Sequence, residues 1–245
     1  MGIVVDTASA LGTSTVHVYA ADLDSAEADP DLLSEDELER ATRFRFDRDR
    51  RRFVAGRSVL RRLLAGYVEA APADISFEYG PHGKPDVAGA PISFNLSHSG
   101  NYALFAIGPR FELGVDVEVL ADARTDDLLV AKQFFSPDEI ATLRAYPPSA
   151  RPRAFLQCWT RKEAFVKARG DGLSLPLQDF DVSFGMDERP ALLRTAWSRG
   201  EPGEWTIEDV SRLFPRVVSG LFPNAVAALA IRSPDVRIVP VGSIE

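Results

Sequence analysis

The sequence predicts an α+β protein built from two halves that meet near residue 112. Apolar residues recur at every second position in some stretches and at every third or fourth position in others, which indicates both strands and helices. Within each half the helical stretches are grouped, and strands follow one another through short turns, which favours antiparallel sheets with segregated helices. The 245 residues suffice for one large domain or two small ones.

The N-terminal half begins with an alternating strand over residues 16–23. A helix follows Ser34, because Ser34 and Glu37 have the spacing of a capping box. A second helix starts near Asp49, where apolar residues lie three and four positions apart. These residues are Phe53, Leu60, Leu63, Leu64 and Tyr67.

Two strands joined by a tight turn complete this half. Residues 79–87, YGPHGKPDV, contain two glycines and two prolines and predict a loop before the strands. Residues 92–97 alternate, which predicts a strand that presents Asn95 and Ser97 on one face. Residues 102–108 are largely apolar and predict its buried partner strand.

The C-terminal half opens with a strand over residues 112–120. Residues 126–145 are predicted to be helical, with Ser136 as an N-cap, and a longer helix runs from Ala154 to Arg169 until GDG ends it. Later strands are predicted at 180–184 and 225–231, whereas residues 186–223 give no clear pattern.

The composition is that of a soluble globular protein, with 45% hydrophobic and 26% charged residues. No apolar run reaches the ~18 residues of a membrane span, and no basic region precedes the apolar N-terminus, so we expect a cytoplasmic protein without membrane contact. The single cysteine, Cys158, excludes an intrachain disulfide and a CxxC zinc site, and it is expected to be a buried core residue.

Charge is unevenly distributed along the chain. The net charge of −8 argues against nucleic-acid binding. Residues 40–62, however, contain ten arginines and only two aspartates. Such a basic segment in an acidic protein predicts a specific anion site or an acidic partner.

The segment GVDVE places two carboxylates on a predicted strand. Val115 and Val117 would face the core, so that Asp116 and Glu118 share the opposite face. Gly114 would leave room there for a ligand. Two like charges need a cation or a basic partner. The strand therefore forms either a Mg²⁺ site or an ordinary solvent-exposed face.

The helix over 154–169 contains a further charged pair. Glu163 and Lys167 are four residues apart and share one face, which is typical of a surface ion pair. Phe165 and the other apolar neighbours instead indicate a largely buried helix, in which charges need partners. Asp116 and Glu118 with a shared cation would provide them. His98, after the strand at 92–97, either projects into a pocket or is structural.

Together these segments resemble the 4′-phosphopantetheinyl transferases of the surfactin-synthetase-activating type. The resemblance covers about residues 34–185, and GVDVE together with WxxKEAFxK is its most specific part. The matching motifs are GKP (83–85), FNLSHSG (94–100), GVDVE (114–118), FFSPDE (134–139) and WTRKEAFVKARGDGL (159–173).

The resemblance implies a transferase that moves the 4′-phosphopantetheine arm of coenzyme A to a serine of an acyl or peptidyl carrier protein. The reaction would release 3′,5′-ADP and use Mg²⁺ or Mn²⁺, in the service of fatty acid, polyketide or nonribosomal peptide biosynthesis. The implied fold is two similar α/β lobes, 1–112 and 113–245, that form an intramolecular pseudodimer with the active site between them. A monomer is expected.

The resemblance also implies roles for individual residues. Asp116, Glu118 and Glu163 would hold the metal, and Glu163 and Lys167 would be catalytic. Ser97 and His98 would bind the 3′-phosphate side, and GKP the adenine end. Glu37 departs from members that are basic at its position. The full set of implied coenzyme-binding residues is Arg40, Arg52, Arg57, Gly83, Lys84, Pro85, Ser97, His98, Lys162 and Lys167.

Two alternatives stay open at this point. The same carboxylates would suit a Mg²⁺-dependent phosphohydrolase or nucleotidyl transferase, although the chain has no P-loop. A non-catalytic module that binds coenzyme A or a carrier would need only part of the acidic set.

Overall fold

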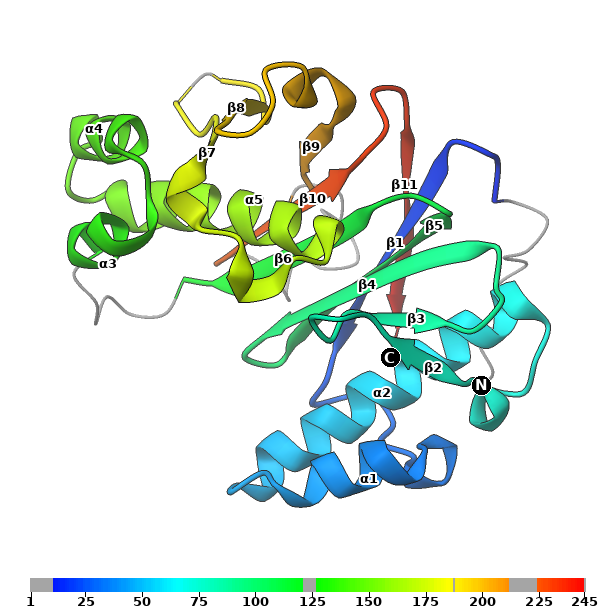
Figure 1. The fold of residues 1–245 in the computed structure, drawn as a ribbon. Helices are drawn as coiled ribbons and strands as arrows, with labels where there is room; N and C mark the ends of the chain where they lie inside the picture. The colour runs from blue at the N-terminus through cyan, green and yellow to red at the C-terminus, as the bar shows by residue number, and fades with distance from the viewer. Residues whose placement is uncertain (1–10, 121–126, 187, 212–223, 245) are drawn as a thin grey trace.

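Figure 1 shows the computed structural model of this protein, which describes residues 11–120, 127–186, 188–211 and 224–244. The predicted α+β class is confirmed, because helices and mostly antiparallel strands are grouped separately in each half. α1 and α2 lie at the bottom of the view and α3 and α4 at the left, and α5 runs from there toward the centre. β7 and β8 lie near the top, and most other strands lie at the centre and right.

The N-terminal half is built on a four-stranded sheet with the order β11-β1-β5-β4. β1 (Thr15–Asp22) and β4 (Ile92–Ser99) are both antiparallel to β5 (Tyr102–Pro109). β4 and β5 form the predicted hairpin through Gly100, whose φ of +62° favours glycine. The outer strand β11 (Arg237–Ile244) comes from the end of the chain and runs parallel to β1, a pairing that the sequence did not predict.

Two helices cover one face of this sheet. α1 (Glu35–Thr42) begins with the predicted capping box, since the Glu37 carboxylate accepts a hydrogen bond from the Ser34 N–H at 3.0 Å. α2 (Asp47–Val68) buries its apolar stripe, with Leu60 fully buried, against β1, β4 and β5. This core fixes the arginines on the other faces of α2.

Residues 77–87 form a short hairpin, not the predicted continuous loop. β2 (Phe77–Tyr79) pairs with β3 (Pro85–Val87), and the glycine-rich residues between them make the turn. Pro85 is compatible with this because it is the first residue of its strand. Gly83 adopts a φ of +82° in the turn.

The C-terminal half contains an antiparallel sheet with the order β6-β10-β9. β6 spans Leu113–Val119, β10 Ala225–Ile231 and β9 Thr206–Asp209. A separate two-stranded sheet pairs β7 (Phe180–Val182) with β8 (Leu192–Thr195). β8 and β9 lie in the stretch that gave no clear pattern. Short 3₁₀ helices occupy Pro30–Leu32, Pro72–Asp74, Gly172–Ser174, Leu177–Asp179 and Glu201–Glu204.

The predicted helix over 126–145 is divided into two, and residue 126 lies outside the described residues. α3 spans Asp127–Phe134 and α4 spans Pro137–Ala145. Ser136 caps α4 as predicted, because its Oγ accepts a hydrogen bond from the Glu139 N–H at 3.2 Å. Proline has no N–H with which to continue α3, so the chain starts a new helix.

The long helix α5 (Arg151–Arg169) starts three residues before the predicted Ala154 and packs against β6 and β10. It ends as predicted at Gly170, where φ is +76°. Within the described residues, no helix combines the length and the apolar character needed to cross a membrane.

The sheets of the two halves share a buried core. Val16 and Leu104 from the N-terminal sheet pack with Val115 and Val117 of β6, and all four are at most 1% exposed. The predicted boundary near residue 112 falls between β5 and β6, but β11 returns to the N-terminal sheet. The 1–112 and 113–245 lobes and the pseudodimer stay predictions, and residues 1–10 lie outside the described part.

Candidate active site

The two carboxylates of GVDVE lie on β6, at the junction of the halves. Val115 and Val117 point into the shared core, as predicted. Asp116 is only 4% exposed, so its face is not the solvent-exposed strand face that the sequence left open. Burial raises the pKa of the Asp116 carboxyl, against the opposing effects of Lys167 and Ser97. Burial also raises the pKa of Glu118, and the nearby Asp116 raises it further.

Helix α5 approaches β6 so closely that only glycine fits at position 114. A Cβ atom on Gly114 would lie 2.1 Å from the Ala164 carbonyl oxygen and 2.4 Å from the Ala168 nitrogen. The expectation that Gly114 leaves room for a ligand is therefore wrong, because the helix backbone fills that space. The close contact fixes the residues that precede these alanines, Glu163 and Lys167, beside the carboxylates of β6.

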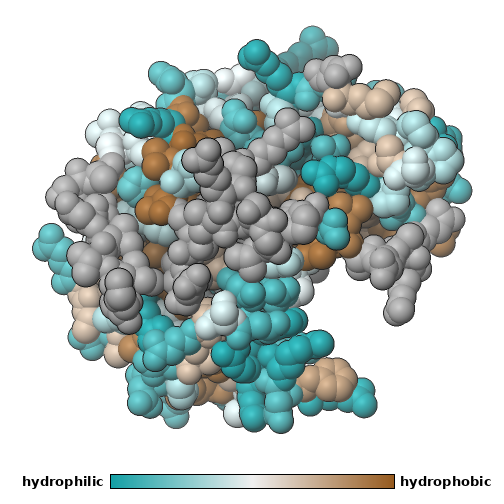
Figure 2. Space-filling model, turned by 180° about the vertical axis from the view of Figure 1, so that it is seen from behind, coloured by the Kyte–Doolittle hydropathy of each residue, from teal (hydrophilic) through white to brown (hydrophobic). Residues whose placement is uncertain are grey.

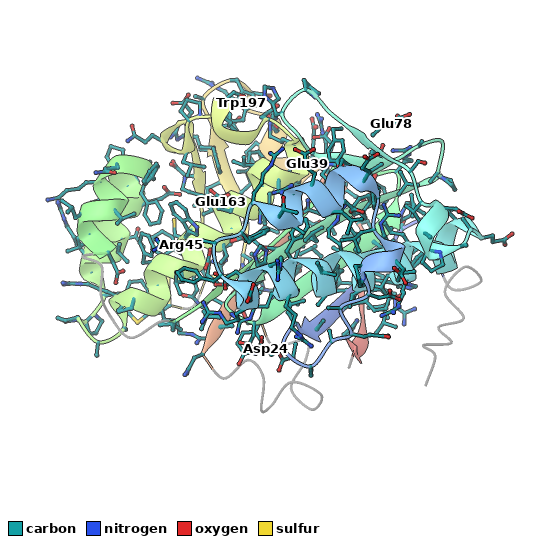
Figure 3. The ribbon with its side chains drawn as sticks, turned by 90° about the horizontal axis from the view of Figure 1, so that it is seen from below. Asp24, Glu39, Arg45, Glu78, Glu163 and Trp197 are labelled. Carbon is teal, nitrogen blue, oxygen red and sulfur yellow. The ribbon has the colours of Figure 1, made fainter. Side chains whose placement is uncertain are left out.

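Lys167 bonds directly to the strand residues. Its Nζ donates to Asp116 Oδ1 at 2.6 Å and to Ser97 Oγ at 2.9 Å. Glu163 projects from the same helix, behind the α1–α2 connection that contains Arg45 in the view of Figure 3.

Glu163 is electrostatically coupled to the same carboxylates. Burial raises its pKa first, and Asp116 and Glu118 raise it further, while Lys167 opposes the shift. The structure thus brings the strand carboxylates and the helix carboxylate into one electrostatic cluster.

Asp116 retains unused capacity to bind a cation. Its Oδ1 accepts bonds from Lys167 and Ser97, but its Oδ2 is buried without a hydrogen-bond partner among the described residues. The described part of the chain has no preformed group of three or more His, Cys, Asp or Glu side chains arranged for a metal. The Lys167 ammonium supplies the positive charge there instead. The all-oxygen donor set nevertheless fits Mg²⁺ or Mn²⁺, because hard cations prefer carboxylate ligands.

The strand alternation of β4 separates Ser97 from His98. Ser97 Oγ faces β6 and donates to Asp116 Oδ1 at 2.8 Å. His98 lies on the other face, which carries Phe94 and packs toward the helices. Although His98 is exposed, partial desolvation lowers its pKa, and Lys167, Arg40 and Arg52 lower it further. The region around His98 is therefore positively charged.

The arginines near His98 differ in how strongly they are held. The Arg52 guanidinium donates two hydrogen bonds to the Asp24 carboxylate, at 2.6 and 2.7 Å, so it is already paired. Arg40 has no carboxylate partner among the described residues, and its guanidinium lies over the Phe53 ring at 5.5 Å. In Figure 2, seen from behind, the end formed by α1 and α2 is largely hydrophilic, and an indentation separates it from the C-terminal half.

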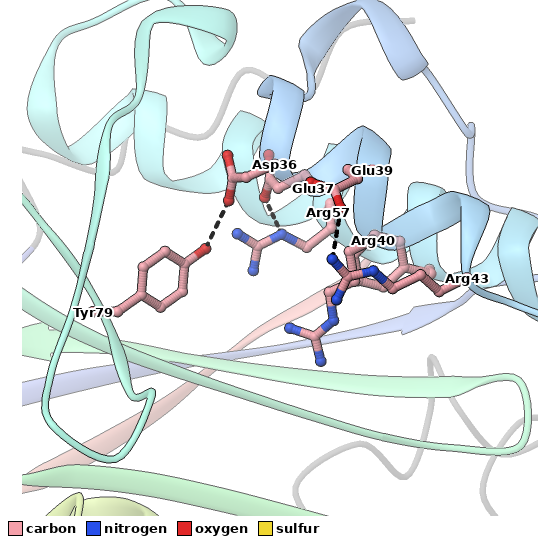
Figure 4. Close-up of a pocket in the computed structure, with 8 residues that line it drawn as sticks. Asp36, Glu37, Glu39, Arg40, Arg43, Arg57 and Tyr79 are labelled. Carbon is pink, nitrogen blue, oxygen red and sulfur yellow. Dashed lines mark hydrogen bonds and ion pairs between the residues drawn. The ribbon is translucent and has the colours of Figure 1, made fainter.

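A pocket of about 250 Å³ opens between α1, α2 and β2 (Figure 4). Arg57 is paired with Glu37 in it, while its buried Nη2 has no hydrogen-bond partner within the described residues. Glu37 also accepts a bond from the buried Arg61 at 2.7 Å, which explains an acid at this position. The full lining is Asp36, Glu37, Glu39, Arg40, Arg43, Phe53, Arg57 and Tyr79.

Lys84 joins the β2–β3 turn to α5. Its Nζ donates to the carbonyl oxygens of Leu113 at 3.0 Å and Ala168 at 2.7 Å. Burial lowers its pKa to about 8. Gly83 and Pro85 flank it in the turn and at the start of β3. The Lys84 ammonium therefore binds backbone of the C-terminal half.

The structure does not bring Lys162 to this site, and the expectation of a coenzyme contact is corrected. Lys162 is fully buried inside the C-terminal half, where it pairs with Glu139 at 2.8 Å. Its Nζ also donates to the carbonyl oxygens of Leu177 and Phe180, so all its protons are used. The sequence held a signal for this, because Cys158 lies one helical turn earlier on the same buried side.

Sequence reasoning missed several residues that border the site. Arg43 and Tyr79 line the pocket, and no local pattern distinguishes them from surface residues. Asn95 and Ser99 contact β6. The signal for these two was the alternation NxSxS in β4, which has the same period as GxDxE in β6.

Comparisons with known proteins find matches along both halves of the chain. Residues 24–110 match the family described as 4′-phosphopantetheinyl transferase, N-terminal, and residues 112–227 match the 4′-phosphopantetheinyl transferase superfamily. The chain is 42% identical over 194 residues to the 4′-phosphopantetheinyl transferase HetI of Nostoc sp., covering 75% of this chain and 80% of the relative.

Two further relatives are more distant. The 4′-phosphopantetheinyl transferase Sfp of Bacillus subtilis is 32% identical over 157 residues, which are 64% of this chain and 68% of the relative. The L-aminoadipate-semialdehyde dehydrogenase-phosphopantetheinyl transferase of Mus musculus is 28% identical over 219 residues, 83% of this chain and 68% of the relative. With the acidic cluster of β6 and α5 and these matches along both halves, the chain belongs to the 4′-phosphopantetheinyl transferase superfamily.

Proposed function

We propose that this chain transfers the 4′-phosphopantetheine arm of coenzyme A to a serine of an acyl or peptidyl carrier protein and releases 3′,5′-ADP. The observation that supports this most directly is the electrostatic cluster of Asp116, Glu118 and Glu163 with Lys167 at the junction of the halves. Its relatives are named for the same transfer.

The charged groups around the cluster suit the anionic parts of coenzyme A. Lys167 would face the pyrophosphate, and His98 with Arg40 would attract the 3′-phosphate. Arg52 would have to release Asp24 before it could bind a phosphate. The unpaired Arg57 Nη2 supports placing the nucleotide end at the pocket under α1. The backbone of the Gly83–Pro85 turn would face the adenine.

The metal would be Mg²⁺ or Mn²⁺, held by Asp116, Glu118 and Glu163. Its fit rests on the oxygen-only donors and the unpartnered Asp116 Oδ2. When bound, the ion would neutralise charge on the pyrophosphate and on the departing 3′,5′-ADP. Lys167 would then release Asp116 and turn toward the phosphates.

The protein supplies the proton acceptor. The carrier serine Oγ attacks the phosphorus that bears the pantetheine arm, and the bond from that phosphorus to the bridging oxygen breaks. The serine proton passes to Glu163, directly or through water, and the bridging oxygen leaves with 3′,5′-ADP. Burial and the neighbouring carboxylates raise the pKa of Glu163, whereas a bound cation would lower it.

We further propose that the protein is cytoplasmic and monomeric and binds neither nucleic acid nor a membrane. The net charge of −8 argues against nucleic-acid binding. The arginine-rich start of α2 would favour an acidic carrier.

Mass spectrometry of an apo carrier after incubation with the chain, coenzyme A and Mg²⁺ tests the proposal. We expect one phosphopantetheine arm on the carrier serine and 3′,5′-ADP in solution. Hydrolysis of coenzyme A with an unmodified carrier would replace the proposal by the phosphohydrolase alternative. Binding of either substrate without turnover would leave only a binding module.

A further inference from the structure

One row of polar side chains on β4 contacts β6, and only its middle member, Ser97, belongs to the predicted site. Asn95, Ser97 and Ser99, here called the β4 polar row, occupy alternate positions on the face of β4 that meets β6. β4 and β6 belong to different sheets and form no ladder with each other. Instead, the side chains of the row form the hydrogen bonds that connect β4 to β6.

Each member of the row accepts a hydrogen bond from a backbone N–H of β6. Asn95 Oδ1 accepts from Val115 at 2.8 Å, Ser97 Oγ from Val117 at 3.4 Å, and Ser99 Oγ from Val119 at 3.2 Å. The spacing is two residues on both strands. The row therefore fixes the register of β6 against the N-terminal half.

The two serines also donate a hydrogen bond to a carboxylate. Ser97 Oγ donates to Asp116 Oδ1 at 2.8 Å, and Ser99 Oγ donates to Glu118 Oε2 at 2.7 Å. Asn95 occupies the corresponding place next to Gly114, where there is no side chain to orient. Each serine hydroxyl thus bonds both to a backbone N–H of β6 and to the carboxylate of the residue just before it in the chain.

Ser99 is itself rigidly placed. It is the last residue of β4, and it pairs with Tyr102 across the Gly100 turn. The turn packs on β6, since a Cβ atom on Gly100 would lie 3.8 Å from Val119 Cγ2. Lys167 and Ser97 both bond to Asp116, so within the described residues Ser99 is the one residue whose side chain donates a hydrogen bond to Glu118.

We propose that Ser99 is a positioning residue that orients the Glu118 carboxylate for metal binding, an inference that rests on the proposed function. An outer-shell hydrogen bond of this kind fixes the direction in which a ligand oxygen points, and its loss typically weakens metal affinity 10- to 100-fold. Ser99 touches neither substrate nor metal in this role and acts through Glu118.

The first test is Mn²⁺ binding to the full chain without substrates, measured by electron paramagnetic resonance. We expect Ser99→Ala to raise the Mn²⁺ dissociation constant about 10-fold or more. Ser99→Thr keeps the hydroxyl and should restore affinity. Ser93→Ala is the matched control, because Ser93 is on the same face of β4 but makes no side-chain hydrogen bond to β6 in the described residues. Unchanged affinity in Ser99→Ala, or an equal loss in Ser93→Ala, overturns the proposal.

A second comparison holds side-chain shape constant. Ser99→Thr and Ser99→Val have side chains of the same shape, but threonine has a hydroxyl where valine has a methyl group. A positioning role predicts weaker Mn²⁺ binding only in the valine variant. Equal Mn²⁺ affinity of the two variants would indicate a purely steric role and would overturn the inference. Carrier modification by the wild-type chain is measured in parallel. If the wild type modifies no carrier while its Mn²⁺ affinity depends on Ser99, the proposed transfer fails and the positioning role stands.

Discussion

At the scale of single residues, the site is decided by which charges are paired. Glu163 and Lys162 are neighbours in the chain, yet one lies in the acidic cluster and the other is bound to Glu139 in the core. Adjacent helix residues point about 100° apart, so neighbours in the chain need not share a face. Lys167 is four residues after Glu163 and shares its side of the helix.

The charge of Glu163 is expected to be essential for turnover and dispensable for folding. Glu163→Gln keeps the size of the side chain but removes the proton acceptor, so transfer should fall by about 10²- to 10⁴-fold. Initial rates of carrier modification measure this, with circular dichroism as the check on folding. Normal turnover in the folded variant would remove Glu163 from the role of base.

Lys84 is expected to make stability depend on pH in the alkaline range. Burial lowers its pKa from 10.5 to about 8, so the unfolded chain binds the proton more tightly than the folded chain. The contribution of Lys84 to stability is therefore lowest below pH 8 and rises as the pH increases from about 8 to 10.5.

Melting temperatures of the wild type and Lys84→Met at pH 8 and pH 10 test this dependence. The melting temperature of the wild type, relative to that of the methionine variant, should be higher at pH 10 than at pH 8. Lys132→Met, on the exposed side of α3, controls for the loss of a lysine elsewhere. If the difference in melting temperature between the wild type and Lys84→Met is the same at both pH values, the lowered pKa of Lys84 is contradicted.

At the scale of elements, the contact between α5 and β6 builds the cluster. The helix and the strand are each predictable from periodicity, but their close approach depends on Gly114 and the small Ala164 and Ala168. The basic segment is also decided at this scale. The excess positive charge of residues 40–62 is offset by acids that lie outside this segment. Asp24 pairs with Arg52, Glu37 with Arg57 and Asp29 with Arg62.

Gly114→Ala is expected to separate α5 from β6. Overlap with the helix backbone cannot be relieved by rotating a side chain, so we expect a loss of about 3 kcal/mol of stability and of transfer activity. Denaturant unfolding measures the stability. Gly203→Ala serves as the control, because a Cβ atom there meets nothing within 4 Å. Wild-type stability in Gly114→Ala would show that the helix does not depend on this contact.

At the scale of the whole molecule, the two halves are joined by the shared core and by β11. β11 begins after β10 of the C-terminal sheet and pairs in parallel with β1 of the N-terminal sheet. Ile238 of β11 packs against the core between the sheets. Both halves should therefore unfold together.

Removal of residues 234–245 tests this coupling. All three tryptophans, Trp159, Trp197 and Trp205, lie in the C-terminal half, so their fluorescence reports that half while circular dichroism reports the whole chain. In the wild type the two transitions should coincide. The truncated chain should melt roughly 10 °C lower, as expected for the loss of several kcal/mol. An unchanged midpoint would mean that β11 contributes nothing to the junction.

The sequence by itself determined the α+β class, most helices and strands, the caps at Ser34 and Ser136, and the acidic residues of the cluster, because periodicity and capping depend on neighbours within a few positions. Only the tertiary structure decided that α5 and not a ligand fills the space at Gly114, that Lys162 turns inward, and that β11 returns to the N-terminal sheet. These outcomes depend on contacts between residues far apart in the chain, and no local pattern encodes which surfaces meet.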